Sequence, residues 1–192
     1  MRMIYKIAKK ELQILFYSPV AWFLLVVFAI QTALVFTGKY EEFLFKNEWR
    51  GAVHMMASAA SFNRLWGAVL EYLYYYIPLL TMNMISRDLN GGTIKLLQSA
   101  PLRNIQVVAG KYMALMVFGL AMMGVILFYV IFGLFTIENI DIPYVLTGIL
   151  GLYLLLCAYA AIGLFMSSLT SYQVVSAMGT LAILAGLSLV RN

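Results

Sequence analysis

The sequence consists of long uncharged stretches separated by shorter segments that carry the charges. No charged residue occurs from Leu12 to Gly38, or from Ile142 to Val190. A single helix over the second stretch would be about 74 Å long, far more than the thickness of a bilayer, so we expect it to fold back at the polar segment 167–173. The pattern predicts membrane-spanning helices at 19–37, 65–86, 105–135, 144–166 and 174–190.

Residues 1–18 predict a different kind of helix. Basic side chains recur there at intervals of three to four positions, at Arg2, Lys6, Lys9 and Lys10. The apolar side chains fall mainly on the opposite side, a pattern typical of an amphipathic helix that lies in the headgroup region of a membrane. Pro19 disfavours helical geometry in the residue before it, so we expect this interfacial helix to end there and the first span to begin.

The composition restricts the class of protein. Of the 192 residues, 64% are hydrophobic and 11% are charged. A compact soluble fold of this length could not bury so much apolar surface, which excludes a soluble enzyme. The aromatic content of 15% excludes a disordered chain, and the unbroken apolar runs exclude the alternating strands of a β-barrel. We therefore predict an all-α integral membrane protein with an interfacial helix and about five transmembrane helices.

The distribution of lysine and arginine predicts the orientation. If the N-terminus is cytoplasmic, segments 1–18, 87–111 and 167–173 lie inside and carry eight of the thirteen basic residues. Basic residues near anionic headgroups explain the net charge of +5, so the lipid membrane is the expected partner and nucleic acid is not.

The sequence offers little catalytic chemistry. It has no G-x-x-x-x-G-K-[ST], H-E-x-x-H or G-x-S-x-G motif and a single histidine, so we expect no catalytic residue, no metal site and no cofactor bound by this chain. Glu71 falls within a predicted span, where a charge is costly. Glu71 and the neighbouring Tyr75 either line a substrate route or are structural groups near the outer surface, with Glu71 paired to Arg64; the structural reading is slightly favoured.

The segment between the second and third predicted spans, 87–104, carries the sharpest local signal. Gly92 permits a tight turn, Thr93 is a good helix N-cap, and Pro101 ends a helix. The apolar side chains between them are Ile94, Leu96 and Leu97. This pattern predicts a short capped helix on the cytoplasmic face, which either fits a cleft of a partner protein or lies passively on lipid; the residues alone favour the two equally.

One ordered set of residues surrounds this segment: Arg87, Asp88, Gly92, Thr93, Leu96, Leu97, Pro101, Gly110 and Lys111. Their order and spacing resemble the signature of ABC transporter permeases of the second exporter type. The Lys-Lys-Glu-Leu helix that ends at Ser18-Pro19 is similar to the interfacial connecting helix of that family, and 158–170 is similar to its fourth span and the following turn. The resemblance covers nearly the whole chain, and the permeases linked to gliding motility are the group that it resembles.

The resemblance implies a permease subunit of an ATP-driven exporter in the bacterial inner membrane. Segment 87–104 would then be the coupling helix, which docks on a separate ABC ATPase that binds the ATP. The ATPase-coupling residues would be Asp88, Gly92, Thr93, Ile94, Leu96, Leu97 and Pro101. Two permease subunits, identical or different, would assemble with the ATPase.

The sequence departs from that family in two respects. Only Asp88 remains of the acidic residues that usually precede the glycine, and the chain ends at Asn192, after the fifth of the family's six spans. We therefore expect a truncated product or a piece of a longer chain. The alternative function is an ATPase-independent membrane scaffold or a secretion or motility component, which would share all of these helices.

Overall fold

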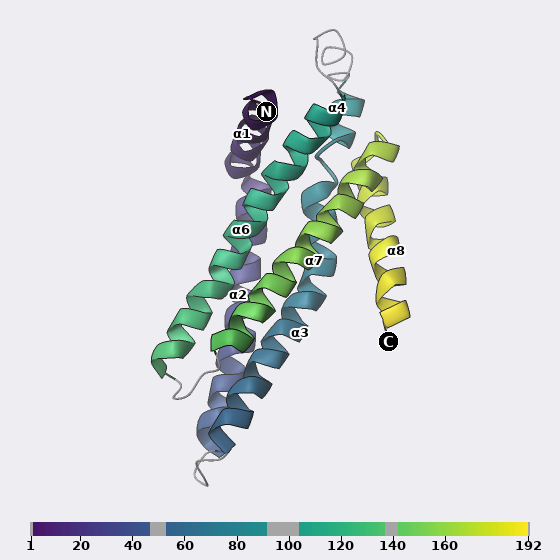
Figure 1. Cartoon of the computed structure of the whole chain (residues 1–192). Helices are drawn as coiled ribbons and strands as arrows, with labels where there is room; N and C mark the ends of the chain where they lie inside the picture. The colour runs from purple at the N-terminus through teal and green to yellow at the C-terminus, as the bar shows by residue number, and fades with distance from the viewer. Residues whose placement is uncertain (1, 47–52, 92–103, 137–141, 192) are drawn as a thin grey trace.

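The computed structural model describes residues 2–46, 53–91, 104–136 and 142–191, and within these ranges the regular structure is entirely helical (Figure 1). In chain order the helices are α1 (Arg2–Tyr17), α2 (Pro19–Lys46), α3 (Val53–Thr81), α4 (Ser86–Asn90), α6 (Asn104–Thr136), α7 (Ile142–Leu169) and α8 (Gln173–Arg191). Segments 19–37, 104–132 and 142–169 are each long and apolar enough to cross a membrane. The prediction of an all-helical chain is confirmed, and its length and composition are consistent with an integral membrane protein.

The junction of α1 and α2 lies where the proline predicts it. Only Ser18 separates the two helices, because Pro19 is tolerated in the first turn of a helix but not in its interior. The indole N–H of Trp22 donates a hydrogen bond to the carbonyl of Phe16 at 2.6 Å, which satisfies one of the last carbonyls of α1. Figure 1 shows α1 running beside the first half of α6, so α1 packs on protein along one side; its position in the headgroup region stays a prediction.

The helix over the second predicted span differs from that span at both ends. The second span was expected at 65–86, but α3 begins at Val53 and ends at Thr81. Residues 53–62 form the first turns of α3. No glycine or proline interrupts residues 53–66, and alanine and methionine there favour continuous helix.

The end of α3 is shaped by its last turn. Pro78 lacks an N–H group, and the hydroxyl of Thr81 donates to the carbonyl of Ile77 at 2.9 Å. A turn over residues 82–85 follows, and α4 then begins at Ser86. The reversal carries the start of segment 87–104 away from the axis of α3.

The remaining helices agree closely with the sequence pattern. Helix α6 matches the expected 105–135 within one residue at each end, and the chain folds back between α7 and α8 at residues 170–172, inside the predicted break. Helices also occupy most of 65–86 and all of 174–190, but whether these two cross a membrane stays a prediction. The apolar part of α8 is short, covering Gln173–Leu189.

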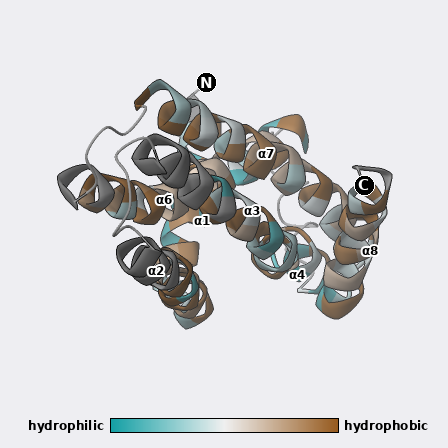
Figure 2. Cartoon of the chain, turned by 90° about the horizontal axis from the view of Figure 1, so that it is seen from below, coloured by the Kyte–Doolittle hydropathy of each residue, from teal (hydrophilic) through white to brown (hydrophobic). Residues whose placement is uncertain are grey.

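The core lies where α2, α3, α6, α7 and α8 meet. Its largest fully buried apolar side chains are Phe28, Leu65, Val69, Leu73, Ile77, Phe118, Met122, Ile126 and Leu184. Large apolar side chains also cover the outside of the bundle, with Phe23, Phe128 and Leu150 all mostly exposed. Figure 2 shows hydrophobic positions along each of the long helices. An apolar exterior of this kind is what lipid-facing helices require.

Candidate functional site

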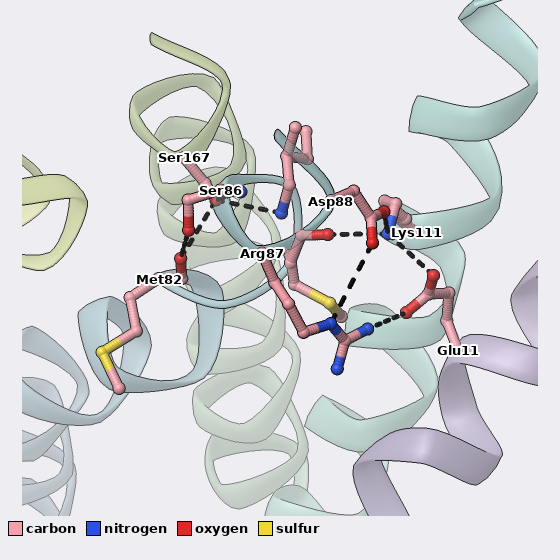
Figure 3. A network of polar contacts seen from close by, with 9 residues as sticks. Glu11, Met82, Ser86, Arg87, Asp88, Lys111 and Ser167 are labelled. Atoms are coloured by element: carbon pink, nitrogen blue, oxygen red, sulfur yellow. Dashed lines mark hydrogen bonds and ion pairs between the residues drawn. The ribbon is translucent and has the colours of Figure 1, made fainter. Parts of the chain in front are cut away.

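Four charged residues from three separate helices meet at the end of the bundle that holds α4 (Figure 3). They are Glu11 of α1, Arg87 and Asp88 of α4, and Lys111 of α6, and we call them the charge cluster. Two carboxylates face two cations, so the cluster is neutral overall. It joins segments that are up to one hundred residues apart in the sequence.

Lys111 is the centre of the charge cluster. Its side chain is only 2% exposed, yet three oxygen atoms surround its ammonium group. Glu11 Oε1 and Asp88 Oδ2 each lie 2.7 Å from Nζ, and the carbonyl oxygen of Met84 lies 2.6 Å away. An ammonium group has three N–H donors, so all three find an acceptor and the buried charge is compensated.

Arg87 closes the cluster on its outer side. Its guanidinium lies 3.7 Å from Glu11 and 4.0 Å from Asp88, longer contacts than those of Lys111, and its side chain is 42% exposed. Contacts of this length and exposure contribute little to stability, so Lys111 holds the cluster together and Arg87 balances its charge.

Gly110 explains how α1 comes close enough for Glu11 to reach Lys111. A Cβ atom at position 110 would lie 2.7 Å from Ile7 Cγ2 and 3.2 Å from the backbone oxygen of Ile4. Only glycine leaves room for α1 at this distance. Gly110 and Lys111 therefore act together: Gly110 leaves room for α1 to approach α6, and Lys111 binds α1 through Glu11.

Ser167 of α7 fixes the turn that precedes α4. Its hydroxyl oxygen accepts hydrogen bonds from the backbone N–H groups of Ile85 at 3.0 Å and Ser86 at 3.1 Å. The same hydroxyl donates to the carbonyl of Met82 at 3.3 Å, and the Ser86 hydroxyl donates to that carbonyl as well. A side chain from a distant helix thus caps the N-terminus of α4 (Figure 3).

We predict that Ser167→Ala destabilises the protein by about 1–3 kcal/mol, because two backbone donors lose their acceptor in a buried place. Ser168→Ala is the matched control, since the exposed Ser168 hydroxyl bonds only within its own helix, to the carbonyl of Phe165 at 2.7 Å. Thermal unfolding in detergent micelles checks the prediction. Equal melting temperatures for the two variants would contradict it.

The structure places only some of the residues that the sequence singles out. Asp88 lies in the charge cluster. Glu71 and Tyr75 lie one turn apart on an exposed face of α3, so neither belongs to the interior of this chain. The other coupling residues fall outside the described residues: Gly92, Thr93, Ile94, Leu96, Leu97 and Pro101. The side chain of Arg64, the expected partner of Glu71, is also outside them.

Sequence reasoning missed the role of Glu11. It is the first acidic residue of the chain and stands alone among the basic residues of the N-terminal helix. Lys111 was named as part of the family signature, with no partner predicted for it. The sequence did contain a signal for this pair: Glu11 is the single acid in a basic helix, and Lys111 is a lysine near the start of an otherwise apolar helix.

The helical fold, its apolar exterior and the polar cluster at one end define a multi-pass membrane protein. The chain matches the family described as ABC-2 family transporter protein over residues 5–192, and it belongs to that family. It is therefore a permease, the non-catalytic membrane subunit of such a transporter. Comparison with curated proteins and with solved structures found no match.

Proposed function

We propose that this permease carries the motion of a separate ABC ATPase into the membrane through segment 87–104. Permeases of this family generally pair with an ABC ATPase. The observation that supports the proposal is the buried contact of Lys111 with both Asp88 and Glu11 at 2.7 Å. A force on segment 87–104 would therefore be transmitted through Asp88 and Lys111 to α6, and through Lys111 and Glu11 to α1.

The packing supports a stiff link rather than a flexible tether. Asp88 is bound to Lys111, and the turn before α4 is held by Ser167. Helix α4, where the segment begins, is therefore attached to α6 through Asp88 and to α7 through the Ser167 hydrogen bonds. Displacement of a docked ATPase would move these helices together instead of being absorbed in a loose loop.

The complete transporter in this proposal contains two permeases and two ATPase subunits in a bacterial inner membrane, and it exports its cargo. The outer face of α3 carries both the apolar side chain of Leu79 and the polar groups of Tyr75 and Glu71, which suits an amphiphilic cargo moving between two subunits. Glu71, on the same face, would then line the route rather than serve a structural role within one chain.

The coupling residues are tested by the paired substitution Leu96→Asp and Leu97→Asp. Two charges on the apolar face of the predicted coupling helix should abolish co-purification of the ATPase, because the docking surface would no longer exclude water. Membrane insertion and the melting temperature of the permease alone should stay unchanged. Lys95→Glu is the control, since position 95 lies on the polar face of the predicted helix.

The readout is the amount of ABC ATPase isolated with the tagged permease from its native host, together with its rate of ATP hydrolysis. If the double variant retained both the ATPase and transport activity, the assignment of segment 87–104 as the coupling helix would be wrong. A native complex without any ABC ATPase would overturn the proposed function and favour a scaffold.

A further inference from the structure

A groove opens next to the charge cluster, between the α1–α2 junction and the C-terminal end of α3. It encloses about 460 Å³, including the part that opens outward. Leu24 and Leu80 are buried in its wall, and Leu79, which is 42% exposed, lies at its mouth. This part of the groove suits a hydrocarbon chain.

The other end of the groove is polar. It is lined by Glu11, Asn83 and Arg87. The side-chain oxygen of Asn83 is buried and has no hydrogen-bond partner among the residues that the structure describes. Among the described residues, Arg87 makes two long ion contacts there, and its side chain is partly exposed. The polar end thus has an acceptor in need of a donor beside a cation whose N–H groups are not fully used.

We propose that this groove binds a zwitterionic phospholipid whose headgroup ends in a primary ammonium, as in phosphatidylethanolamine. The ammonium would donate to Asn83 Oδ1 and Glu11, the phosphate would face Arg87, and one acyl chain would follow Leu79 and Leu80 along α3. Along the chain, the polar lining residues Asn83 and Arg87 follow the apolar Leu79 and Leu80, as the headgroup of a lipid follows its acyl chain.

The charges of the site select among headgroups. The charge cluster is neutral, so an anionic lipid gains no net attraction there, and its headgroup has no ammonium to face Glu11. A choline headgroup has no N–H donor and would leave the buried oxygen of Asn83 unsatisfied. A headgroup with a phosphate and N–H donors can pair its phosphate with Arg87 and donate a hydrogen bond to Asn83. The inference rests on the membrane location of the family and is independent of the proposed coupling.

The test measures lipid retained by the purified full-length permease in native mass spectrometry. The probes are phosphatidylethanolamine, its N-methyl and N,N-dimethyl forms, phosphatidylcholine and phosphatidylglycerol, all with the same acyl chains. We expect a stepwise loss with each methyl group, reaching about tenfold for phosphatidylcholine, since a hydrogen bond to a charged group is lost. Phosphatidylglycerol should bind no better than phosphatidylcholine. Equal retention of all headgroups, or preference for the anionic lipid, would overturn the proposal.

Two variants place the lipid in this groove rather than elsewhere on the surface. Leu79→Trp fills the mouth and should reduce retention of phosphatidylethanolamine about tenfold, whereas Asn83→Leu should abolish only the preference over phosphatidylcholine. The control is Leu169→Trp, at an exposed leucine of α7 that does not line the groove. If Leu79→Trp retains the lipid as well as Leu169→Trp does, the site is wrong, and this outcome leaves ATPase docking untouched.

Discussion

Replacing Lys111 with methionine should lower the stability of the permease by about 3–5 kcal/mol, because removal of one partner leaves buried charge without compensation. Methionine keeps the length and apolar character of the side chain, so the loss reflects the ammonium group. Glu11 and the Met84 carbonyl lose a partner at 2.7 Å and 2.6 Å, and Asp88 loses one at 2.7 Å. Thermal unfolding in detergent, followed by size-exclusion chromatography, measures the change.

The pairing of Lys111 with Glu11 is isolated by a double-mutant cycle with Glu11→Gln. We expect the two substitutions to be less than additive by about 1–3 kcal/mol, as for residues in direct contact. Lys10→Met is the matched control, since Lys10 is an exposed lysine of α1 and its loss should change stability by no more than about 0.5 kcal/mol. Strict additivity, or equal effects at positions 10 and 111, would show that the cluster is not a stabilising unit.

Gly110→Ala should displace α1 from α6 and destabilise the permease by about 1–3 kcal/mol, since the new methyl group has no room. Its Cβ would meet both Ile7 and the backbone of Ile4. A side chain can change rotamer but the backbone of α1 cannot, so the whole helix must shift. Because Lys111 follows directly, the same shift should lengthen the contact with Glu11 and weaken the coupling measured above.

Gly124 provides the control on the same helix. A Cβ there has nothing within 4 Å, so Gly124→Ala should be neutral or stabilise by up to about 1 kcal/mol through helix propensity. Melting temperatures of the two variants, compared side by side, measure the difference. If Gly110→Ala proved as stable as Gly124→Ala, the close approach of α1 would not be a constraint on the fold.

The sequence predicts those features that depend on local pattern. Uncharged runs place the apolar helices, and Pro19 and the polar segment 167–173 place two breaks, because each of these signals acts over a few neighbouring residues. Helix α3 begins well before the predicted span, since its first turns contain no helix breaker. Its end depends on Ser167, a residue more than eighty positions away.

The candidate site was predictable only in part for the same reason. The order of Arg87, Asp88, Gly110 and Lys111 pointed to the family, and the family match confirms it. It did not reveal that Glu11 completes the cluster, since that contact depends on how α1 packs along α6. Ion pairs between distant segments depend on tertiary packing, so local sequence patterns do not predict them.

The central claim is that α1 and α4 move as one unit because Lys111 joins them. Spin labels at the exposed positions Gln13 of α1 and Leu89 of α4, placed after Cys157→Ala, report this distance in the complex with the ATPase. We predict one narrow distance distribution that is the same with and without ATP, and a broad one after Lys111→Met. A distance that changes with ATP in the parent protein, or a distribution that Lys111→Met leaves unchanged, would contradict the account.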